Sequence, residues 1–168
     1  SEHWLCSPSL FAAGVKLFFC RALHSGETGA RNRFKEGMLR RYYKLPEERV
    51  DAYVDSFRAQ LNTGVIDKIK AGNYDRIIVV SASEEKLIRR VLEGVFDGFD
   101  VIANSLEEGK GFSTCYGTEK VRRLAAFMPD YADHDIEVYT DSMSDRPLME
   151  IAKRSYLVKD KELTEATL

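Results

Sequence analysis

The sequence predicts an α/β protein in which a mainly parallel sheet flanked by helices follows a block of helices at the N-terminal end. Three observations predict this fold class. Roughly the first 70 residues carry apolar side chains at helical spacing. The run "DRIIVVSAS", Asp75 to Ser83, is then short, apolar and β-branched, as in a strand buried on both faces. After it, strand and helix patterns alternate, which is typical of an open, doubly wound sheet.

The composition limits the class of protein further. A chain of 168 residues, 44% hydrophobic and 31% charged, can bury one substantial core and carry a small accessory domain. The net charge of -2, with no basic block beyond Arg33 to Arg41, argues against a nucleic-acid partner. Cys6, Cys20 and Cys115 are too far apart to indicate a disulfide framework or a zinc site. We therefore expect a protein of the reducing cytoplasm.

The first strongly apolar segment is "LFAAGVKLFFCRAL", Leu10 to Leu23. Lys16 and Arg21 interrupt it, and it is shorter than the roughly 20 apolar residues that a spanning helix needs. We therefore predict no membrane span here. A buried helix or the apolar wall of a pocket is the favoured interpretation, and contact with a membrane surface is the alternative.

Two more helices are predicted in the N-terminal block. One covers Thr28 to Tyr43, and the other lies in "LPEERVDAYVDSFRAQL", where Pro46 suits the first helical position. The stretch Asn62-Thr63-Gly64 is the predicted domain boundary. The sequence thus predicts a helical domain over residues 1–62 and an α/β core over residues 63–168.

The core pattern places candidate site residues at strand ends. After the first strand it predicts, in order, a helix over Glu84–Gly94, a strand over Phe99–Ala103, a helix over Glu119–Met128, a strand over Ile136–Thr140, a helix over Pro147–Lys153 and a strand over Ser155–Val158. Ligands of open parallel sheets bind beyond the carboxyl ends of the strands. Ser81 follows "IIVV" and Asp141 follows "IEVYT", so we expect both at that edge.

Asp141, Ser142 and Asp145 follow the third predicted strand. Aspartate and serine there can cap a helix and complement its dipole, which needs no further function. Two carboxylates on one turn at a strand end also suit Mg²⁺, which prefers oxygen ligands and keeps positions open for phosphate. The three residues alone do not decide between these interpretations.

Lys120 favours an anion site. It falls in the first turn of the helix predicted in "YGTEKVRRLAAFM", with Thr118 as the expected N-cap, and the helix dipole opposes a cation there. An exposed lysine tolerates that small penalty, whereas a functional lysine would meet a phosphate. Ser81 and Ser83 are likewise either caps of the next helix or hydroxyl donors to a phosphoryl oxygen.

In this order and on these elements, the residues resemble the haloacid dehalogenase (HAD) superfamily of phosphohydrolases, in particular its phosphoserine phosphatase-like branch. "IIVVSAS" is similar to the second family motif, "CYGTEKVRRL" to the third, and "VYTDSMSDRPLMEIAKRSYLV" to the fourth. The resemblance covers about residues 74–158. It implies a Rossmann-like core, with the preceding helices as the cap that this branch inserts between its first and second motifs.

The resemblance also implies an activity, a cofactor and residue roles. The expected activity is Mg²⁺-dependent hydrolysis of a small-molecule phosphate ester through an aspartyl-phosphate intermediate. Asp141 would be a Mg²⁺ ligand, and Asp145 would support the metal or hold the lysine. Lys120 and Ser81 would bind the phosphoryl oxygens, with Ser83 as a further substrate-binding residue.

One family motif is missing. The first motif, DxDx[T/V], supplies the nucleophilic aspartate, and no such motif ends a strand before the helical block. Asp133 and Asp135 have the right spacing but precede their strand, and Asp51 and Asp55 lie on an amphipathic helix. We therefore expect the nucleophile to be deleted or to lie N-terminal to this sequence. The alternatives are a non-catalytic phosphate-binding or regulatory module and, less favoured by the helical N-terminal block, a flavodoxin-like receiver domain.

Overall fold

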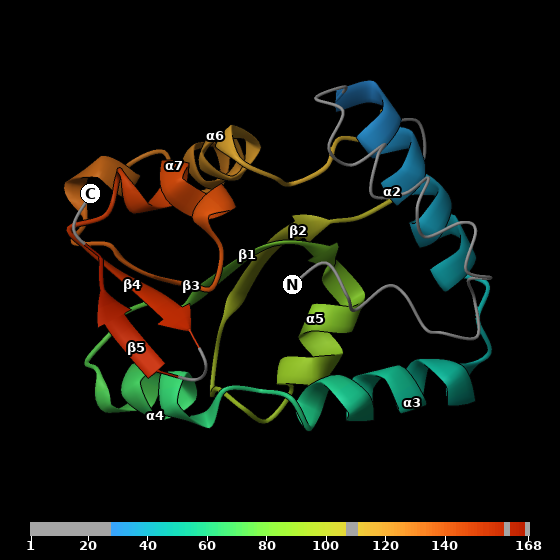
Figure 1. Cartoon of the computed structure of the whole chain (residues 1–168), viewed down its shortest axis with the longest axis horizontal. Helices are drawn as coiled ribbons and strands as arrows, with labels where there is room; N and C mark the ends of the chain where they lie inside the picture. Colours follow the sequence, from blue (N-terminus) through green and yellow to red (C-terminus); the bar gives the residue numbers. More distant parts are fainter. Residues whose placement is uncertain (1–27, 107–110, 160–161, 167–168) are drawn as a thin grey trace. The chain divides into compact units, whose positions relative to one another are not determined.

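The computed structural model describes residues 28–106, 111–159 and 162–166. The chain divides into two compact units, residues 1–45 with 106–114, and residues 46–105 with 115–168. The predicted helix at Leu10–Leu23 lies outside the described residues. Within the described ranges, the fold consists of helices and two small sheets (Figure 1). None of the described helices is long and apolar enough to cross a membrane.

The smaller unit is built on helix α2, Thr28–Tyr42, as predicted to within one residue. Met38 and Leu39 are its buried apolar side chains. Asn32 accepts a hydrogen bond from the backbone N–H of Thr114 at 3.0 Å. This bond fastens the loop that precedes residue 115 to α2, within the same unit.

The larger unit begins with two helices, α3 (Glu47–Arg58) and α4 (Thr63–Ala71). Helix α3 was predicted, although Pro46 is its N-cap and not its first helical residue. Helix α4 was not predicted, because Asn62 was interpreted as a boundary residue, whereas its side chain caps α4 by accepting from the Val65 N–H at 3.2 Å. The division into domains at residue 62 stays a prediction.

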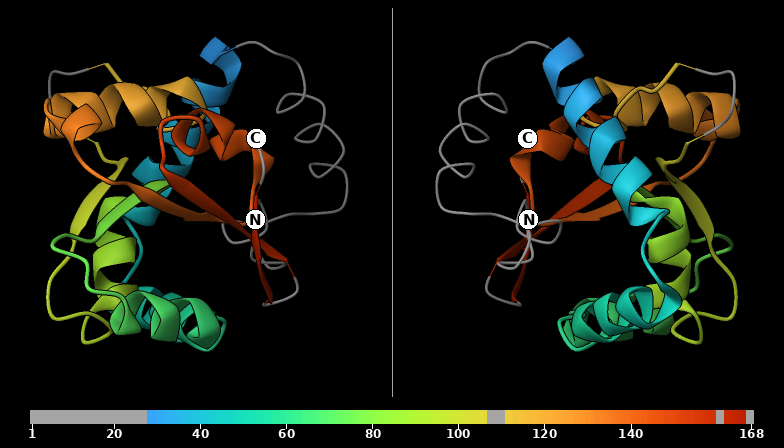
Figure 2. Two further views of the ribbon diagram at one scale, coloured as in Figure 1. Left: turned by 90° about the vertical axis from the view of Figure 1, so that its left-hand side faces the viewer. Right: turned by 90° about the vertical axis from the view of Figure 1, so that its right-hand side faces the viewer.

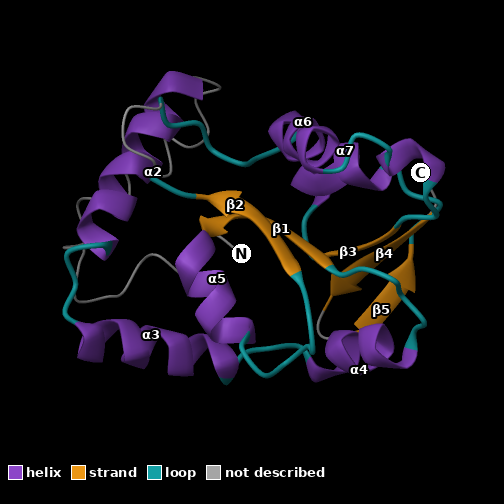
Figure 3. Cartoon of the chain, turned by 180° about the vertical axis from the view of Figure 1, so that it is seen from behind, coloured by secondary structure: helices purple, strands orange, loops and turns teal. Residues whose placement is uncertain are grey.

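The strands form two sheets in the described part of the chain. Strands β1 (Ile78–Glu84) and β2 (Asp100–Asn104) pair in parallel, and so do β3 (Glu137–Thr140) and β4 (Arg154–Lys159). Strand β5 (Glu162–Glu165), which was not predicted, pairs antiparallel with β4. The parallel pairings agree with the prediction, but the described strands do not join into one sheet, since β1 and β3 are each paired along one edge only (Figure 3).

The helices of the larger unit lie on both sides of these strands. Helix α5 is Glu85–Leu92, α6 is Thr118–Phe127, and the short helices η2, η3 and α7 are Tyr131–Asp133, Met143–Asp145 and Arg146–Met149. Helix α7 ends earlier than predicted, because the chain turns at Ala152 into β4. Helices α6 and α7 lie on one side of the strands and α4 on the other (Figures 1 and 2).

One apolar core spans the two sheets. Its buried members come from β2, α6, α7 and the loop before α6, and the apolar side chains of β1 and β3 pack against them: Ile102, Cys115, Leu124 and Leu148, with Ile78, Val80 and Val138. Because this core joins the β1–β2 pair to the β3–β4 pair, the ends of β1 and β3 belong to one packed body. Of the candidate site residues, Ser81 and Ser83 lie in the last part of β1, whereas Asp141 and Asp145 follow β3.

Candidate active site

Ser81 lies where the regular pairing of β1 ends. Residues 78–80 pair in register with residues 100–102 of β2, and the register then shifts before Glu84 meets Asn104. The Ser81 hydroxyl accepts a hydrogen bond from the backbone N–H of Ser83 at 3.1 Å. A hydroxyl that accepts one bond keeps its own proton for donation. The geometry is therefore compatible with the predicted donation to a phosphoryl oxygen.

The cap of α5 is neither of the two serines that sequence reasoning considered. Glu84 is the N-cap, and its buried carboxylate accepts a hydrogen bond from the Leu87 N–H at 2.6 Å. Serine is the commoner capping residue, so the pattern favoured Ser81 or Ser83. Since Glu84 supplies the cap, capping does not explain the presence of either serine.

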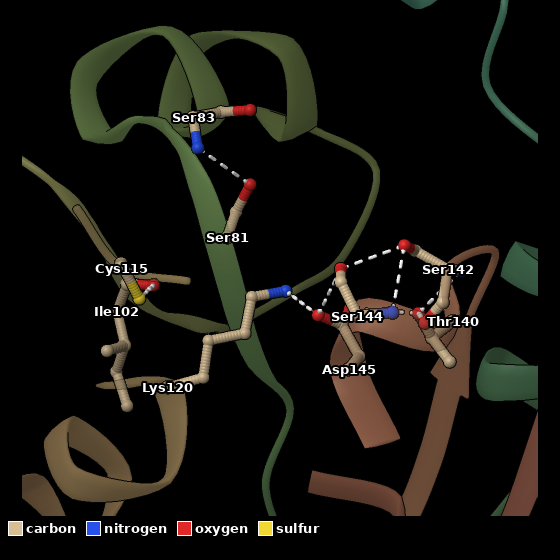
Figure 4. A network of polar contacts seen from close by, with 9 residues as sticks. All are labelled: Ser81, Ser83, Ile102, Cys115, Lys120, Thr140, Ser142, Ser144 and Asp145. Atoms are coloured by element: carbon tan, nitrogen blue, oxygen red, sulfur yellow. Dashed lines mark hydrogen bonds and ion pairs between the residues drawn. The ribbon is translucent and has the colours of Figure 1, made fainter. Parts of the chain in front are cut away.

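Lys120 lies in the first turn of α6, as predicted, but the N-cap of this helix differs from the expectation. The N-cap is Gly117, whose φ of 58° favours glycine, and Thr118, the expected cap, is the first helical residue. The Lys120 residue is only 6% exposed. Its ammonium lies 2.5 Å from Oδ1 of Asp145 (Figure 4). A carboxylate thus offsets the unfavourable position of this cation near a helix N-terminus.

Thr140 completes the environment of Asp145 and was missed in the sequence. Its buried hydroxyl donates to Oδ2 of Asp145 at 2.9 Å and accepts from the Ser142 N–H at 3.1 Å. A buried ion pair is stable only when its remaining polar atoms are also hydrogen bonded. The alternation of β3 was a usable signal, because it places Thr140 on the same face as the core residue Val138.

The two predicted metal ligands have different environments. Both oxygens of Asp145 are engaged, one by Lys120 and one by Thr140. Asp141 follows β3 directly and is exposed, and its side chain makes no hydrogen bond or ion pair with another described residue. Within the described ranges, no group of three or more His, Cys, Asp or Glu side chains is placed to hold a metal ion. Asp141 therefore fits a Mg²⁺ ligand better than Asp145 does, and a metal there needs oxygen atoms from elsewhere.

Asn104, another residue that sequence reasoning missed, ends β2 and is 1% exposed. Its side-chain N–H donates to the Ala82 carbonyl at 2.6 Å, and its oxygen accepts from the Cys115 N–H at 2.7 Å. Cys115 is itself buried, and this burial raises the pKa of its thiol, although the charges of Arg123 and Lys120 act in the opposite direction. Cys115 is therefore a core side chain and not a reactive nucleophile.

A second tie joins α6 to the end of β2. Arg123 donates to the Ala103 carbonyl at 2.7 Å and forms an ion pair with Glu119. Glu119 also pairs with Arg122, and its pKa falls to about 2, mainly because Arg122 donates hydrogen bonds to its carboxylate. The first turn of α6, which carries Lys120, is thus anchored to β2 by a charged side chain.

The structure brings Lys120 and Asp145 into direct contact, while Ser81 makes its own hydrogen bond on β1 (Figure 4). The convergence of Ser81, Lys120 and Asp141 on one crevice stays a prediction. Asp133 lies in η2 and Asp135 pairs with Lys153, and both precede β3, as the sequence indicated.

The sequence was compared with known families, curated proteins and solved structures. The sequence matches the family described as haloacid dehalogenase-like hydrolase over residues 7–150, which is most of the chain. The chain therefore belongs to the haloacid dehalogenase-like hydrolases, and the resemblance seen in its motifs is confirmed at the level of the superfamily. No curated protein and no solved structure gave a significant match.

Proposed function

We propose that the chain forms the larger part of a Mg²⁺-dependent phosphatase that hydrolyses a small-molecule phosphate ester in the cytoplasm. The observation that carries this proposal is the buried Lys120–Asp145 pair, which a hydrogen bond joins to Thr140 at the end of β3. An ammonium group has three donors, and a single contact with Asp145 leaves others for phosphoryl oxygens. Such a preorganised cation stabilises the charge on a phosphoryl group as it is transferred.

In this mechanism the attacking group is an aspartate. No DxDx[T/V] motif that could supply it ends a strand before the helical block of this sequence. The aspartate carboxylate would attack phosphorus as the alcohol leaves, and water would then hydrolyse the aspartyl-phosphate. The strand topology supports this proposal, because β1 and β3 are each paired along one edge only among the described strands. A further parallel strand carrying the aspartate can pair with both edges.

Asp141 is the residue that would hold Mg²⁺ in the complete site. The metal ion would neutralise charge on the transferring group. Asp145, whose oxygens already contact Lys120 and Thr140, would orient the lysine. Ser81 would donate its hydroxyl proton to a phosphoryl oxygen, and Ser83 would contribute to the same substrate-binding segment.

The helices before the core are proposed to act as the cap that selects the substrate, as in the phosphoserine phosphatase-like branch. The proposed division places this cap at residues 1–62 and the Rossmann-like core at residues 63–168. Helix α2 lies in the smaller compact unit, which supports a body distinct from most of the core, whereas α3 falls in the larger unit.

The test is hydrolysis of an aryl phosphate with and without Mg²⁺. The chain itself should show no turnover, and a chain extended by an apolar strand that ends in DxDx[T/V] should show Mg²⁺-dependent turnover. The matched control carries asparagine in place of the first aspartate of that motif. In the extended chain, Asp141→Asn and Lys120→Ala should each lower turnover by about 10²-fold or more. Mg²⁺-dependent turnover by the unextended chain would contradict the proposal, and Asp133 and Asp135 would be tested next.

A second candidate function is a non-catalytic phosphate-binding or regulatory module. This alternative keeps the phosphate-binding residues of the first proposal and needs no attacking aspartate. Phosphate binding by the extended chain, combined with no turnover of any ester in a broad panel, would support this alternative.

A further inference from the structure

We propose that Asn104 is a positioning residue for the phosphate site, a role that rests on the proposed function. Its carboxamide joins the segment that carries Ser81 to the segment that leads into α6 and Lys120. These segments are far apart in sequence, and both approach the end of β2. Asn104 would fix the distance between two phosphate-binding side chains without touching phosphate itself.

The first half of this link stabilises an irregular part of β1. Ladder pairing is regular up to Val80 and resumes, after a register shift, at Glu84. Ala82 lies in the interval and follows Ser81 directly. The Asn104 side chain donates to the Ala82 carbonyl at 2.6 Å, so it supplies a hydrogen bond where the regular ladder is interrupted. Loss of this bond would release the backbone next to Ser81.

The second half of the link is a hydrogen bond at Cys115, where the chain re-enters the larger unit. Residues 106–114 belong to the smaller unit, and Cys115 is the first residue of the larger unit after them. The Cys115 N–H donates to Asn104, and its buried sulfur lies 3.8 Å from the Ile102 carbonyl. Gly117 and α6 follow immediately. Asn104 therefore fixes the point from which the Lys120 helix starts.

A buried amide with both ends hydrogen bonded also stabilises a fold, so the test must separate positioning from stability. Asn104→Asp is the informative variant. In its carboxylate form, the new side chain keeps the oxygen that accepts from the Cys115 N–H. Its second oxygen, which cannot donate, lies next to the Ala82 carbonyl. When protonated, the same side chain regains a donor for Ala82. The variant thus breaks one half of the link at neutral pH and restores it at low pH.

The measurement is the dissociation constant for inorganic phosphate, determined by calorimetry on protein shown to be folded by circular dichroism. At neutral pH, Asn104→Asp should bind phosphate about fivefold or more weakly than the parent, as for a lost buried hydrogen bond. The ratio of the two constants should approach one as the pH falls. Asn104→Leu, which loses both halves, should stay weak at every pH. Asn104→Ser, which fits the space but cannot reach both partners, replaces it if the leucine variant does not fold.

The matched control is Val91→Ala, which removes buried apolar volume from α5 without touching the link. It should lower stability and leave the phosphate dissociation constant unchanged. Folded Asn104 variants that bind phosphate like the parent would overturn the positioning role alone. A parent chain that binds no phosphate would contradict the proposed function, and the role of Asn104 in phosphate binding would fall with it.

Discussion

Two ionic clusters of the larger unit differ in burial, and this difference changes what each contributes to the protein. The side chains of Lys120 and Asp145 are 8% and 12% exposed. Arg90 pairs with Glu47 and Asp51, which are 73% and 58% exposed, and this cluster links α5 to α3. Exposed ion pairs connect elements but add little to the free energy of unfolding. A buried pair has a large desolvation cost, so its presence beside the end of β3 requires an explanation beyond stability.

Removal of one partner should show the difference most strongly. Asp145→Ala leaves the Lys120 ammonium buried without its carboxylate, and the free energy of unfolding should fall by about 3–5 kcal/mol. Urea denaturation monitored by circular dichroism gives this value. The double variant Lys120→Met/Asp145→Leu removes both charges and should recover most of the loss. A loss below about 1 kcal/mol for Asp145→Ala would mean that the buried pair behaves like an exposed one.

The hydrogen bonds around the buried pair should have the next largest effect. Thr140→Val removes the donor to Asp145 and the acceptor of the Ser142 N–H while keeping the shape of the side chain. The free energy of unfolding should fall by about 1–3 kcal/mol. Thr140→Ser retains the hydroxyl and is the control. Equal stabilities of the valine and serine variants would show that the hydroxyl does not support Asp145.

Acid should weaken the tie between α6 and β2. The folded pKa of Glu119, about 2, is below its ordinary value of 4.5, so its contribution to stability is complete above about pH 4.5 and disappears as the pH falls through about 2. Glu119→Gln should remove this part of the pH dependence. The measurement is the free energy of unfolding as a function of pH, compared with the parent. Parallel profiles for parent and variant would rule out this contribution.

The exposed cluster should give the smallest effect. A double-mutant cycle with Arg90→Ala and Glu47→Ala should yield a coupling free energy of about 0.2–1 kcal/mol, and added salt should reduce it. The cycle uses the same urea denaturation as the buried pair. A coupling of several kcal/mol would remove the distinction between the two clusters.

Most local structure was predictable, since apolar spacing marks α3, α6, β1, β2 and β3 directly in the sequence. Lys120 in a first helical turn and Asp141 directly after β3 were also predicted, because both positions follow from local pattern. Strand β5 was missed because "ELTE" is polar and pairs at a sheet edge, where burial imposes no apolar pattern.

The contacts across the core were not predictable in the same way. The position of Lys120 favoured an anion, and the family resemblance offered Asp145 as a residue that would hold the lysine. The spacing alone could not identify this partner, because Asp145 comes from a different element. Asn104 looks like an ordinary strand end in "DVIAN", and its role depends on two backbone groups that only the fold brings near. Strand pairing likewise depends on all strands present, so the run lengths did not reveal that the described strands form two sheets.

The most direct test of the central claim is a phosphate titration followed by NMR of the backbone amides. We expect saturable shifts of the amide signals of Ser81 and Asp141 in the parent chain. In Lys120→Met/Asp145→Leu, which keeps the core free of an unpaired charge, the affinity for phosphate should fall about tenfold or more, as expected when a charge-assisted hydrogen bond is lost. Saturable shifts of the same size and affinity in this variant, or none in the parent, would contradict the claim that the buried lysine forms an anion site.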